Sequence, residues 1–495
     1  MIVRIKSLII VTLSILVVPI VGLVIAGNVS QKYDTQFQAA VAEAYKVTEA
    51  KVVEAGIDLH KLCSDTKTAS SFSDACSYIN QIDLLKTASF YTLILGLVLL
   101  VFIYLIKLVI GLNRARLAAL FSPVATITIA VISISILLQG AILIYGFYIA
   151  EVVYTEHYHP KIIILLALGA IITSYALIKA AFGALKSKPK FVFSEKITSE
   201  NGSKLINLVK DIANKIGSEI PTNIIVGIEP NFYITAGKVE IAETGEILEG
   251  TTMYLSLPFL SIFSKEELSA VIGHELGHFK GEDTVYSIRF YPAYIKLYNA
   301  INNVQQNNSD SQSIFSAIAV APLSFILNEF STTERTIGRI RELEADKAGS
   351  SVNGSLPLIS SLLKVSEYGA IWTDLRIYNI DTLNEGKIYN NLTAFYTDFS
   401  DNIFENLNFE ASSEILLAST ISHPTDTHPT IIERMHSLKV DRDKLNKELI
   451  KPSQTPLTDY IDDADSINES LTLQEHRLMI SYGYAKLPEE NENNE

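Results

Sequence analysis

Four apolar runs in the first 190 residues limit the folds open to this chain more than any other feature. The hydrocarbon core of a bilayer is about 30 Å thick, a distance that a helix of ~20 apolar residues spans. We therefore expect residues 1–190 to form a membrane module with four transmembrane helices. The predicted helices cover about 8–27, 91–112, 126–150 and 162–185.

The first run, Leu8–Gly27, follows Arg4 and Lys6. A secretory signal peptide has the same charged start, but its apolar core is usually only ~7–15 residues long. The greater length of this run favours a retained membrane anchor over a cleaved signal peptide.

Basic residues lie on one side of the four predicted spans. They precede the first span, separate the second from the third, and follow the fourth. Segments rich in Lys and Arg beside a span stay in the cytoplasm. We therefore expect a multi-pass inner-membrane protein, with the loop 28–86 outside the cytoplasm and the part after residue 190 inside it. The residues concerned are Arg4, Lys6, Lys107, Arg114, Arg116, Lys186, Lys188 and Lys190.

The two cysteines of the chain, Cys63 and Cys76, both lie in the loop 28–86. Disulfides persist in oxidising compartments outside the cytoplasm. A Cys63–Cys76 disulfide is therefore one interpretation. Two unpaired thiols are the other, because the sequence does not show the geometry that a disulfide needs.

The chain after the fourth run has the composition of a soluble domain. We expect residues 191–487 to form a mainly helical domain with a small sheet, and the acidic residues 488–495 to be a disordered tail. The formal net charge of −14 and the absence of a basic stripe argue against a nucleic-acid partner.

Short strands are expected at Asn223–Ile228, Phe232–Ala236 and Thr252–Leu257. In the last of these, polar residues alternate with apolar ones. This alternation predicts a strand with one face in water.

The sequence His274-Glu275-Leu276-Gly277-His278 carries the clearest chemistry. Ser264 and Glu267 have the spacing of a capping box, which predicts a helix through the motif to about Lys280. Histidines four residues apart share one helix face and can bind a single zinc ion. In this motif the glutamate serves as a general base toward a water molecule that the metal activates.

A catalytic zinc ion needs three protein ligands and one open position. The best source of the third ligand is the segment that contains Glu342 and Asp346, which share a helix face. Glu342 can bind the ion while Asp346 hydrogen-bonds a ligand histidine. The alternative interpretation is one more charged helical face, because carboxylates at this spacing are common.

The apolar segment Ile314–Phe330 falls between His278 and Glu342. A single membrane crossing there would place two ligands of one ion on opposite sides of the bilayer. We therefore expect a helix that is buried or rests on the membrane surface, with a re-entrant hairpin as the alternative.

Three segments resemble, in order, the signatures of the HtpX-type and CAAX prenyl protease family of zinc metallopeptidases. The resemblance covers about 197–438. It implies one zinc ion bound by His274, His278 and Glu342, catalysis by Glu275, and a ligand histidine oriented by Asp346. The three segments are GHELGHFKGEDT at 273–284, RELEADKAG at 341–349 and HPTIIERMHSL at 428–438.

The third signature implies roles for two more residues. His428 matches the histidine expected to stabilise the oxyanion of the reaction. Arg434 matches an arginine expected to position its loop or to pair with a carboxylate. His423 begins a second His-Pro step but lacks an arginine six residues later, so His428 is the better match.

The resemblance also bears on the ligand choice and on the sheet. The family's spacing of glutamate and aspartate selects Glu342 over Glu344 as the ligand. The strand Thr252–Leu257 lies where the family has an edge strand that receives the substrate backbone, a form of β-augmentation.

We therefore expect a membrane-anchored zinc metalloendopeptidase that acts on membrane-associated proteins or peptides, with membrane protein quality control as a role the family suggests. All clear spans precede the catalytic part, unlike the family's usual pattern, so prenylated substrates are not implied. The alternative is an inactive, zinc-stabilised membrane scaffold or chaperone. Glu275 argues against it, because a structural site needs no base. A transporter is disfavoured, since the spans carry no paired charges.

Overall fold

A computed structural model describes residues 2–64, 70–111, 113–155, 157–183, 189–279, 294, 297–299, 301–302, 314–418 and 428–486. The chain divides into two compact units, which are described separately below. The first unit comprises Met1–Lys186 and Phe290–Thr332, and the second Ser187–Arg289 and Thr333–Glu495. The expected tail, 488–495, lies outside the described residues.

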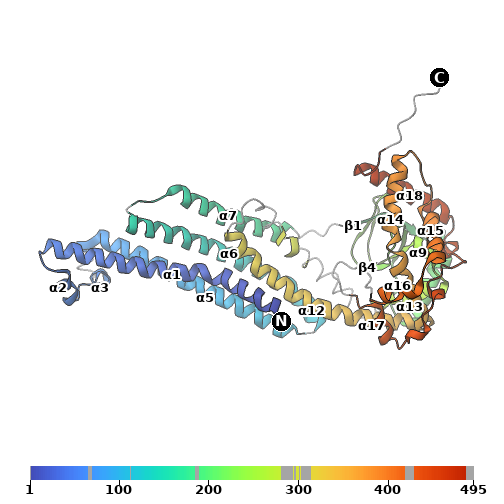
Figure 1. The fold of residues 1–495 in the computed structure, drawn as a ribbon, viewed down its shortest axis with the longest axis horizontal. Helices are drawn as coiled ribbons and strands as arrows, with labels where there is room; N and C mark the ends of the chain where they lie inside the picture. Colours follow the sequence, from blue (N-terminus) through green and yellow to red (C-terminus); the bar gives the residue numbers. More distant parts are fainter. Residues whose placement is uncertain are drawn as a thin grey trace, which may run out of the picture. The chain divides into compact units, whose positions relative to one another are not determined.

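Four long helices form the first unit (Figure 1): α1 (Ile2–Ala44), α5 (Ser73–Ile110), α6 (Arg114–Thr155) and α7 (Pro160–Gly183). Each is long and apolar enough to cross a membrane. Helix α6 packs against the other three. The predicted four-helix membrane module is thus confirmed, and the chain is a membrane protein. Helices α1, α5 and α6 are longer than their apolar runs because the polar residues beyond these runs remain helical.

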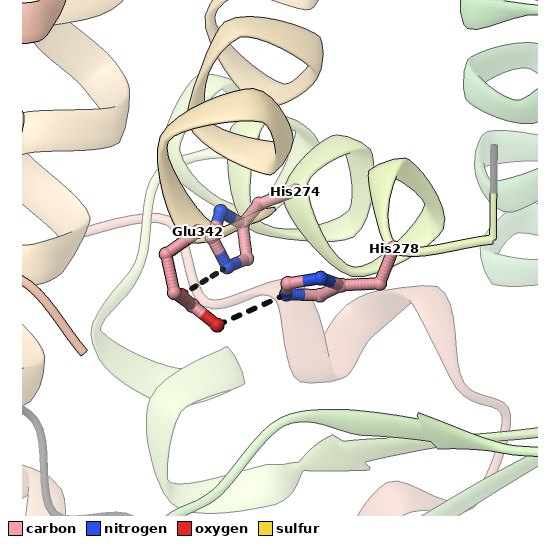
Figure 2. A group of neighbouring side chains, drawn as sticks. All are labelled: His274, His278 and Glu342. Atoms are coloured by element: carbon pink, nitrogen blue, oxygen red, sulfur yellow. Dashed lines mark ion pairs between the residues drawn. The ribbon is translucent and has the colours of Figure 1, made fainter. Parts of the chain in front are cut away.

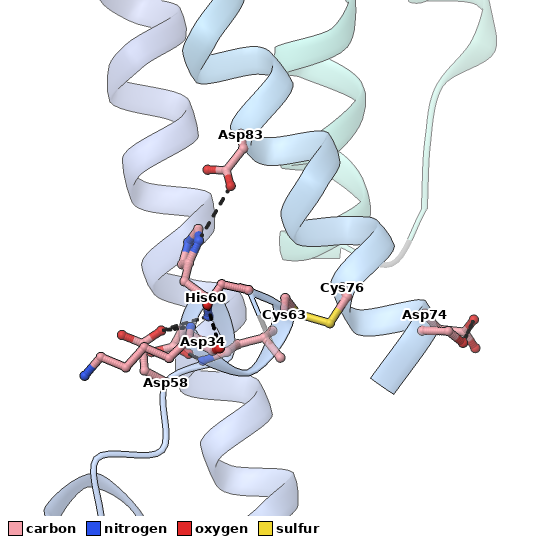
Figure 3. The surroundings of a disulfide bond; sticks show 11 residues. Asp34, Asp58, His60, Cys63, Asp74, Cys76 and Asp83 are labelled. Carbon is pink, nitrogen blue, oxygen red and sulfur yellow. Dashed lines mark hydrogen bonds and ion pairs between the residues drawn. A yellow bond between two sulfur atoms is a disulfide. The ribbon is translucent and has the colours of Figure 1, made fainter. Parts of the chain in front are cut away.

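The segment expected as a loop, 28–86, is mostly helical. It contains the end of α1, the short helices α2 (Glu49–Glu54), α3 (Leu59–Ser64) and η1 (Ser70–Phe72), and the start of α5. A disulfide between Cys63 and Cys76 joins α3 to α5 (Figure 3). His60 of α3 lies 3.6 Å from Asp83 of α5. This part of the chain is therefore a cross-linked helical extension of the first unit.

Helix α12 (Ile314–Asn353) is a single helix of 40 residues that contains Pro322. Its apolar beginning belongs to the first unit, where the ring of Phe330 lies 4.7 Å from that of Phe121. The helix expected over 314–330 is therefore the first part of a longer one. This assignment differs from the expected division, which placed all residues after 190 in one domain, and the contact of Phe330 with Phe121 of α6 lies within the first unit.

The second unit contains two small sheets. The first has the order β1-β5-β6 and the second the order β2-β3-β7-β4. Strand β7 runs parallel to β3 and antiparallel to β4. The strands are β1 (Lys190–Val192), β2 (Glu195–Ile197), β3 (Asn223–Gly227), β4 (Tyr233–Thr235), β5 (Val239–Ile241), β6 (Ile247–Leu248) and β7 (Thr252–Ser256).

Strand β7 corrects two expectations. It is an interior strand between β3 and β4, so it is not the edge strand that the resemblance suggested. All of its residues are buried, so it has no face in water. Its polar side chains are satisfied within the protein: the Tyr254 hydroxyl accepts from the Glu229 N–H at 3.0 Å, and Ser256 caps the next helix. The alternation of polar and apolar residues in the sequence cannot show whether a polar side chain forms hydrogen bonds with water or with groups inside the protein.

Helices cover the sheets and complete the second unit, and their apolar faces form its main core with β3 and β7. They are α8 (Ser203–Ile216), α9 (Leu257–Ile262), α10 (Lys265–Gly277), the end of α12, α13 (Ser355–Tyr368), α14 (Ile371–Asn384), α15 (Leu392–Asn406), α16 (Phe409–Ala418), α17 (Ile431–Ser437), η2 (Arg442–Lys444), η3 (Lys447–Ile450), η4 (Leu457–Tyr460) and α18 (Ala464–Ser481).

Candidate metal centre

Helix α10 carries His274, Glu275 and, as its C-cap residue, His278. The predicted capping box begins this helix: the Ser264 hydroxyl accepts from the Glu267 N–H at 3.2 Å, and the Glu267 carboxylate accepts from the Ser264 N–H at 2.6 Å. Two otherwise unpaired backbone donors are thereby satisfied. The histidines follow at helical spacing and point to the same side.

Glycines let α10 and α12 approach closely. A Cβ atom on Gly273 would lie 3.1 Å from the Cα of Gly349, and one on Gly277 would lie 3.1 Å from the Cα of Ala345. Both distances are shorter than ordinary carbon contacts, so side chains at these positions would push the helices apart. The two glycines of the motif therefore serve helix packing, which brings Glu342 to the histidines.

Figure 2 shows the imidazoles of His274 and His278 converging on the Glu342 carboxylate. His274 Nε2 and His278 Nε2 each lie 3.5 Å from an oxygen of Glu342. Ligands about 2.0–2.2 Å from one tetrahedral ion are separated by roughly 3.3–3.5 Å, so this spacing fits a shared zinc ion. Among the described residues these three form a group able to hold a metal.

Asp346 and Arg434 lie behind His274. The Asp346 carboxylate is 3.0 Å from His274 Nδ1, and it accepts two hydrogen bonds from the Arg434 guanidinium, one of them 2.8 Å long. When the Nδ1–H group donates a hydrogen bond to Asp346, the lone pair of Nε2 is left to face the metal position. Asp346 is fully buried and Arg434 is 1% exposed, so each charge depends on the other.

His428 lies beside the third ligand. Its Nδ1 is 2.8 Å from Glu342 Oε2, and its side chain is 14% exposed. The structure therefore places His428 in contact with the carboxylate that would bind the ion. The competing His423 lies outside the described residues.

Burial and charge shift the acid–base properties of the metal-free centre. Burial raises the pKa of Glu275 to about 7. Burial lowers the pKa of His278 to about 3. For His274 burial also lowers the pKa, but hydrogen bonds that its ring donates to Asp346 and Glu342 outweigh burial and raise the pKa to about 10. Burial would raise the pKa of Glu342, but the nearby histidines hold it well below the ordinary value.

One supporting residue escaped the sequence analysis. Lys364 of α13 is buried and donates to the Glu267 carboxylate at 2.8 Å and to the carbonyl of Ile262 at 3.0 Å. It thus fixes the first turn of the metal-bearing helix. A lysine directly after the apolar run that ends at Leu363 was the available signal, since such a position is rarely charged without a partner.

A helix-borne His-Glu-x-x-His pair, completed by a glutamate from a second helix, is the ligand set of a class of metallopeptidases. Comparison with known families agrees, because residues 204–441 match the model of peptidase family M48. The matched residues make up just under half of the chain, which is therefore similar to HtpX-type peptidases of this family.

The relatives include proteins named protease HtpX homolog. The one from Thermoplasma volcanium is 27% identical over 177 residues, covering 34% of this chain and 52% of the relative. The one from a Sulfurihydrogenibium species is 28% identical over 194 residues, covering 35% of this chain and 59% of the relative. The chain thus matches between about half and three-fifths of the length of these relatives. No solved structure matches the chain.

Proposed function

We propose that this chain is a membrane-anchored zinc metalloendopeptidase that hydrolyses peptide bonds of protein substrates. The observation that carries the proposal is the convergence of His274, His278 and Glu342 around one position, with Glu275 on the same helix as the two histidines. A structural metal site needs ligands but no adjacent base, whereas peptide hydrolysis needs both.

Each residue has a distinct task in this proposal. His274, His278 and Glu342 would hold the ion, which when bound activates a water molecule and polarises the scissile carbonyl. Glu275 accepts the proton of the attacking water and returns it to the leaving amine. His428, next to Glu342, donates a hydrogen bond to the oxyanion that develops on the substrate. Asp346 holds His274 in the tautomer that leaves Nε2 free.

The substrate strand needs an unpaired sheet edge. Strand β7 does not offer one, but β4 pairs only with β7 in the described part of the chain. We assign the pairing with substrate backbone to β4, which contacts α10 as well.

Cellular placement follows from the charge pattern of the spans. Basic residues flank the spans on one side, which supports an inner-membrane protein with its metal centre in the cytoplasm. Membrane-associated proteins, including misfolded ones, are the substrates we propose. The relatives' printed name, protease HtpX homolog, supports the peptidase part of this proposal.

The test uses purified full-length protein in detergent and an unfolded protein substrate. We expect cleavage that a chelator stops and zinc restores. Glu275→Gln should reduce the cleavage rate about 10²–10⁴-fold while zinc content stays unchanged, because only the base is lost. Equal cleavage by wild type and Glu275→Gln would disprove the mechanism. Zinc binding without any cleavage would favour the alternative, a zinc-stabilised scaffold or chaperone.

A further inference from the structure

The segment 428–437, which consists of His428, Pro429, Thr430 and helix α17, contacts α12 at three positions. His428 Nδ1 lies 2.8 Å from Glu342 Oε2. Arg434 pairs with Asp346, and Glu433 pairs with Arg339. Positions 339, 342 and 346 are three and four residues apart and therefore lie on one face of α12. The short segment thus contacts residues on successive turns of that face. Two of these three positions belong to the candidate metal centre.

The segment is firmly built into the second unit. Thr430 and Glu433 form a capping box that begins α17. Ile431 and Met435 are buried in an apolar cluster that also contains Ala270, on the metal-bearing helix α10. The contacts with α12 are therefore made by a defined element with its own apolar anchors.

Arg434 is the centre of these contacts. Its side chain is 1% exposed, and its guanidinium donates hydrogen bonds to both carboxylate oxygens of Asp346. The same guanidinium lies 3.4 Å from His274 Nδ1, the atom that Asp346 also contacts at 3.0 Å. A movement of α17 would thus shift the carboxylate that orients a metal ligand. It would also remove His428 from Glu342.

We infer that residues 428–437 form a metal-linked latch: docking of this segment on α12 and binding of zinc at His274, His278 and Glu342 strengthen one another. In this role Arg434 is a positioning residue that acts through Asp346. Linkage makes the effect reciprocal, so zinc must stabilise the docked latch by the same factor by which the docked latch tightens zinc binding. The inference rests on the metal centre of the proposed function but not on peptidase activity.

A merely structural role for the segment predicts different behaviour. If Arg434 and Asp346 only packed the core, zinc would leave the exchange of the α17 amides unchanged, and any damage from substitution would appear as general instability. The latch instead predicts that zinc slows hydrogen exchange only in the latch and in the residues that it contacts. Metal affinity and local hydrogen exchange separate the two cases.

The variants test affinity in full-length protein by competition for zinc with a chromophoric chelator. Arg434→Lys keeps the positive charge but loses the paired hydrogen bonds that the guanidinium donates to Asp346. Asp346→Asn keeps the shape of the side chain but loses its negative charge. Each should weaken zinc binding about 10–100-fold, the usual effect of changing a group that orients a ligand. Arg442→Lys is the matched control. It makes the same change at an exposed arginine outside the segment, which pairs with Glu414, and should change affinity less than about threefold.

Hydrogen exchange of wild type with and without zinc needs no substitution, so it decides the case even if a variant fails to fold. Zinc should slow exchange in Ile431–Ser437 at least severalfold, while Ala464–Ser481, remote in the sequence, stays unchanged. Unchanged exchange in α17, or folded Arg434→Lys that binds zinc as tightly as wild type, would overturn the latch. Protein that binds zinc and protects α17 but cleaves nothing overturns the proposed function alone. Wild type that binds no zinc overturns both.

Discussion

The two units of this protein bury polar groups of different kinds. In the described part of the first unit the buried polar side chains are all uncharged: Ser89, Thr92, Thr128, Ser133, Ser135, Gln139, Thr173 and Ser174. The second unit buries charged groups as well: Glu267, Glu334, Glu342, Asp346, Lys364, Arg434 and Glu475.

The difference follows from the surroundings of each unit. A hydroxyl inside a membrane helix can donate to its own backbone, as Ser133 does to the Ile129 carbonyl at 2.8 Å. A charge has no such local partner and is costly in a bilayer. In the second unit, Glu267 pairs with Lys364 and Glu475 pairs with Arg376, while Glu342, Asp346 and Arg434 lie at the candidate metal centre. The comparison teaches that this unit can bury charges either in supporting ion pairs, such as Lys364 with Glu267, or at the metal centre itself.

The largest expected effect concerns the buried pair of Lys364 and Glu267, at the first turn of α10. Lys364→Met should destabilise the second unit by about 3–5 kcal/mol, because Glu267 would stay buried with its cation removed. Zinc affinity of the folded fraction should change little. The opening free energy of α10 amides, from hydrogen exchange, measures the loss. Lys387→Met, which breaks an exposed pair with Glu385, is the control and should cost less than about 1 kcal/mol.

If Lys364→Met were as stable as wild type, buried charge would not need its partner in this unit. Buried ion pairs that support the fold could then no longer be distinguished from the buried charges of the metal centre.

A second effect concerns pH and the metal. The pKa of His274 in the metal-free protein is raised to about 10, so its ring carries a proton at pH 7 that zinc must displace. One proton released per ion makes zinc affinity rise about tenfold per pH unit between pH 6 and 8 and fall as pH is lowered. Competition titrations corrected for chelator protonation measure this slope. A flat profile would show that His274 is neutral before the metal binds.

The smallest effect concerns the membrane unit. Gln139 of α6 donates to Ser135 Oγ at 3.0 Å and to the Ile15 carbonyl of α1 at 3.4 Å. Hydrogen bonds between membrane helices contribute only about 0.6 kcal/mol on average, so Gln139→Leu should scarcely change the stability of the bundle. Unfolding in mixed detergent micelles checks this. A loss comparable to that of Lys364→Met would remove the contrast between the units.

Features that depend on neighbouring residues were predictable from the sequence. The spans follow from apolar length, and the start of α10 follows from Ser264 and Glu267, whose capping box the structure contains. The proximity of Glu342 to the two histidines was inferred from spacing and resemblance, and the structure brings the three together.

Features that depend on distant pairing were not predictable. The interior position of β7 arises from strands on both sides, which a local pattern of alternation cannot show. Likewise, Lys364 finds its partner 97 residues away in the sequence, so its role becomes visible only in the folded chain. The placement of the start of α12 in the first unit has the same origin, since Phe330 contacts Phe121, which lies far earlier in the chain.

Zinc stoichiometry of two glutamate variants tests the central claim most directly. Glu342 is buried between the histidines, whereas Glu344, two residues later on the same helix, is exposed. Purified full-length wild type and Glu344→Gln should each contain one zinc ion per chain by elemental analysis, and Glu342→Gln should contain little or none. Full zinc occupancy in Glu342→Gln, or none in wild type, would contradict the account of the metal centre.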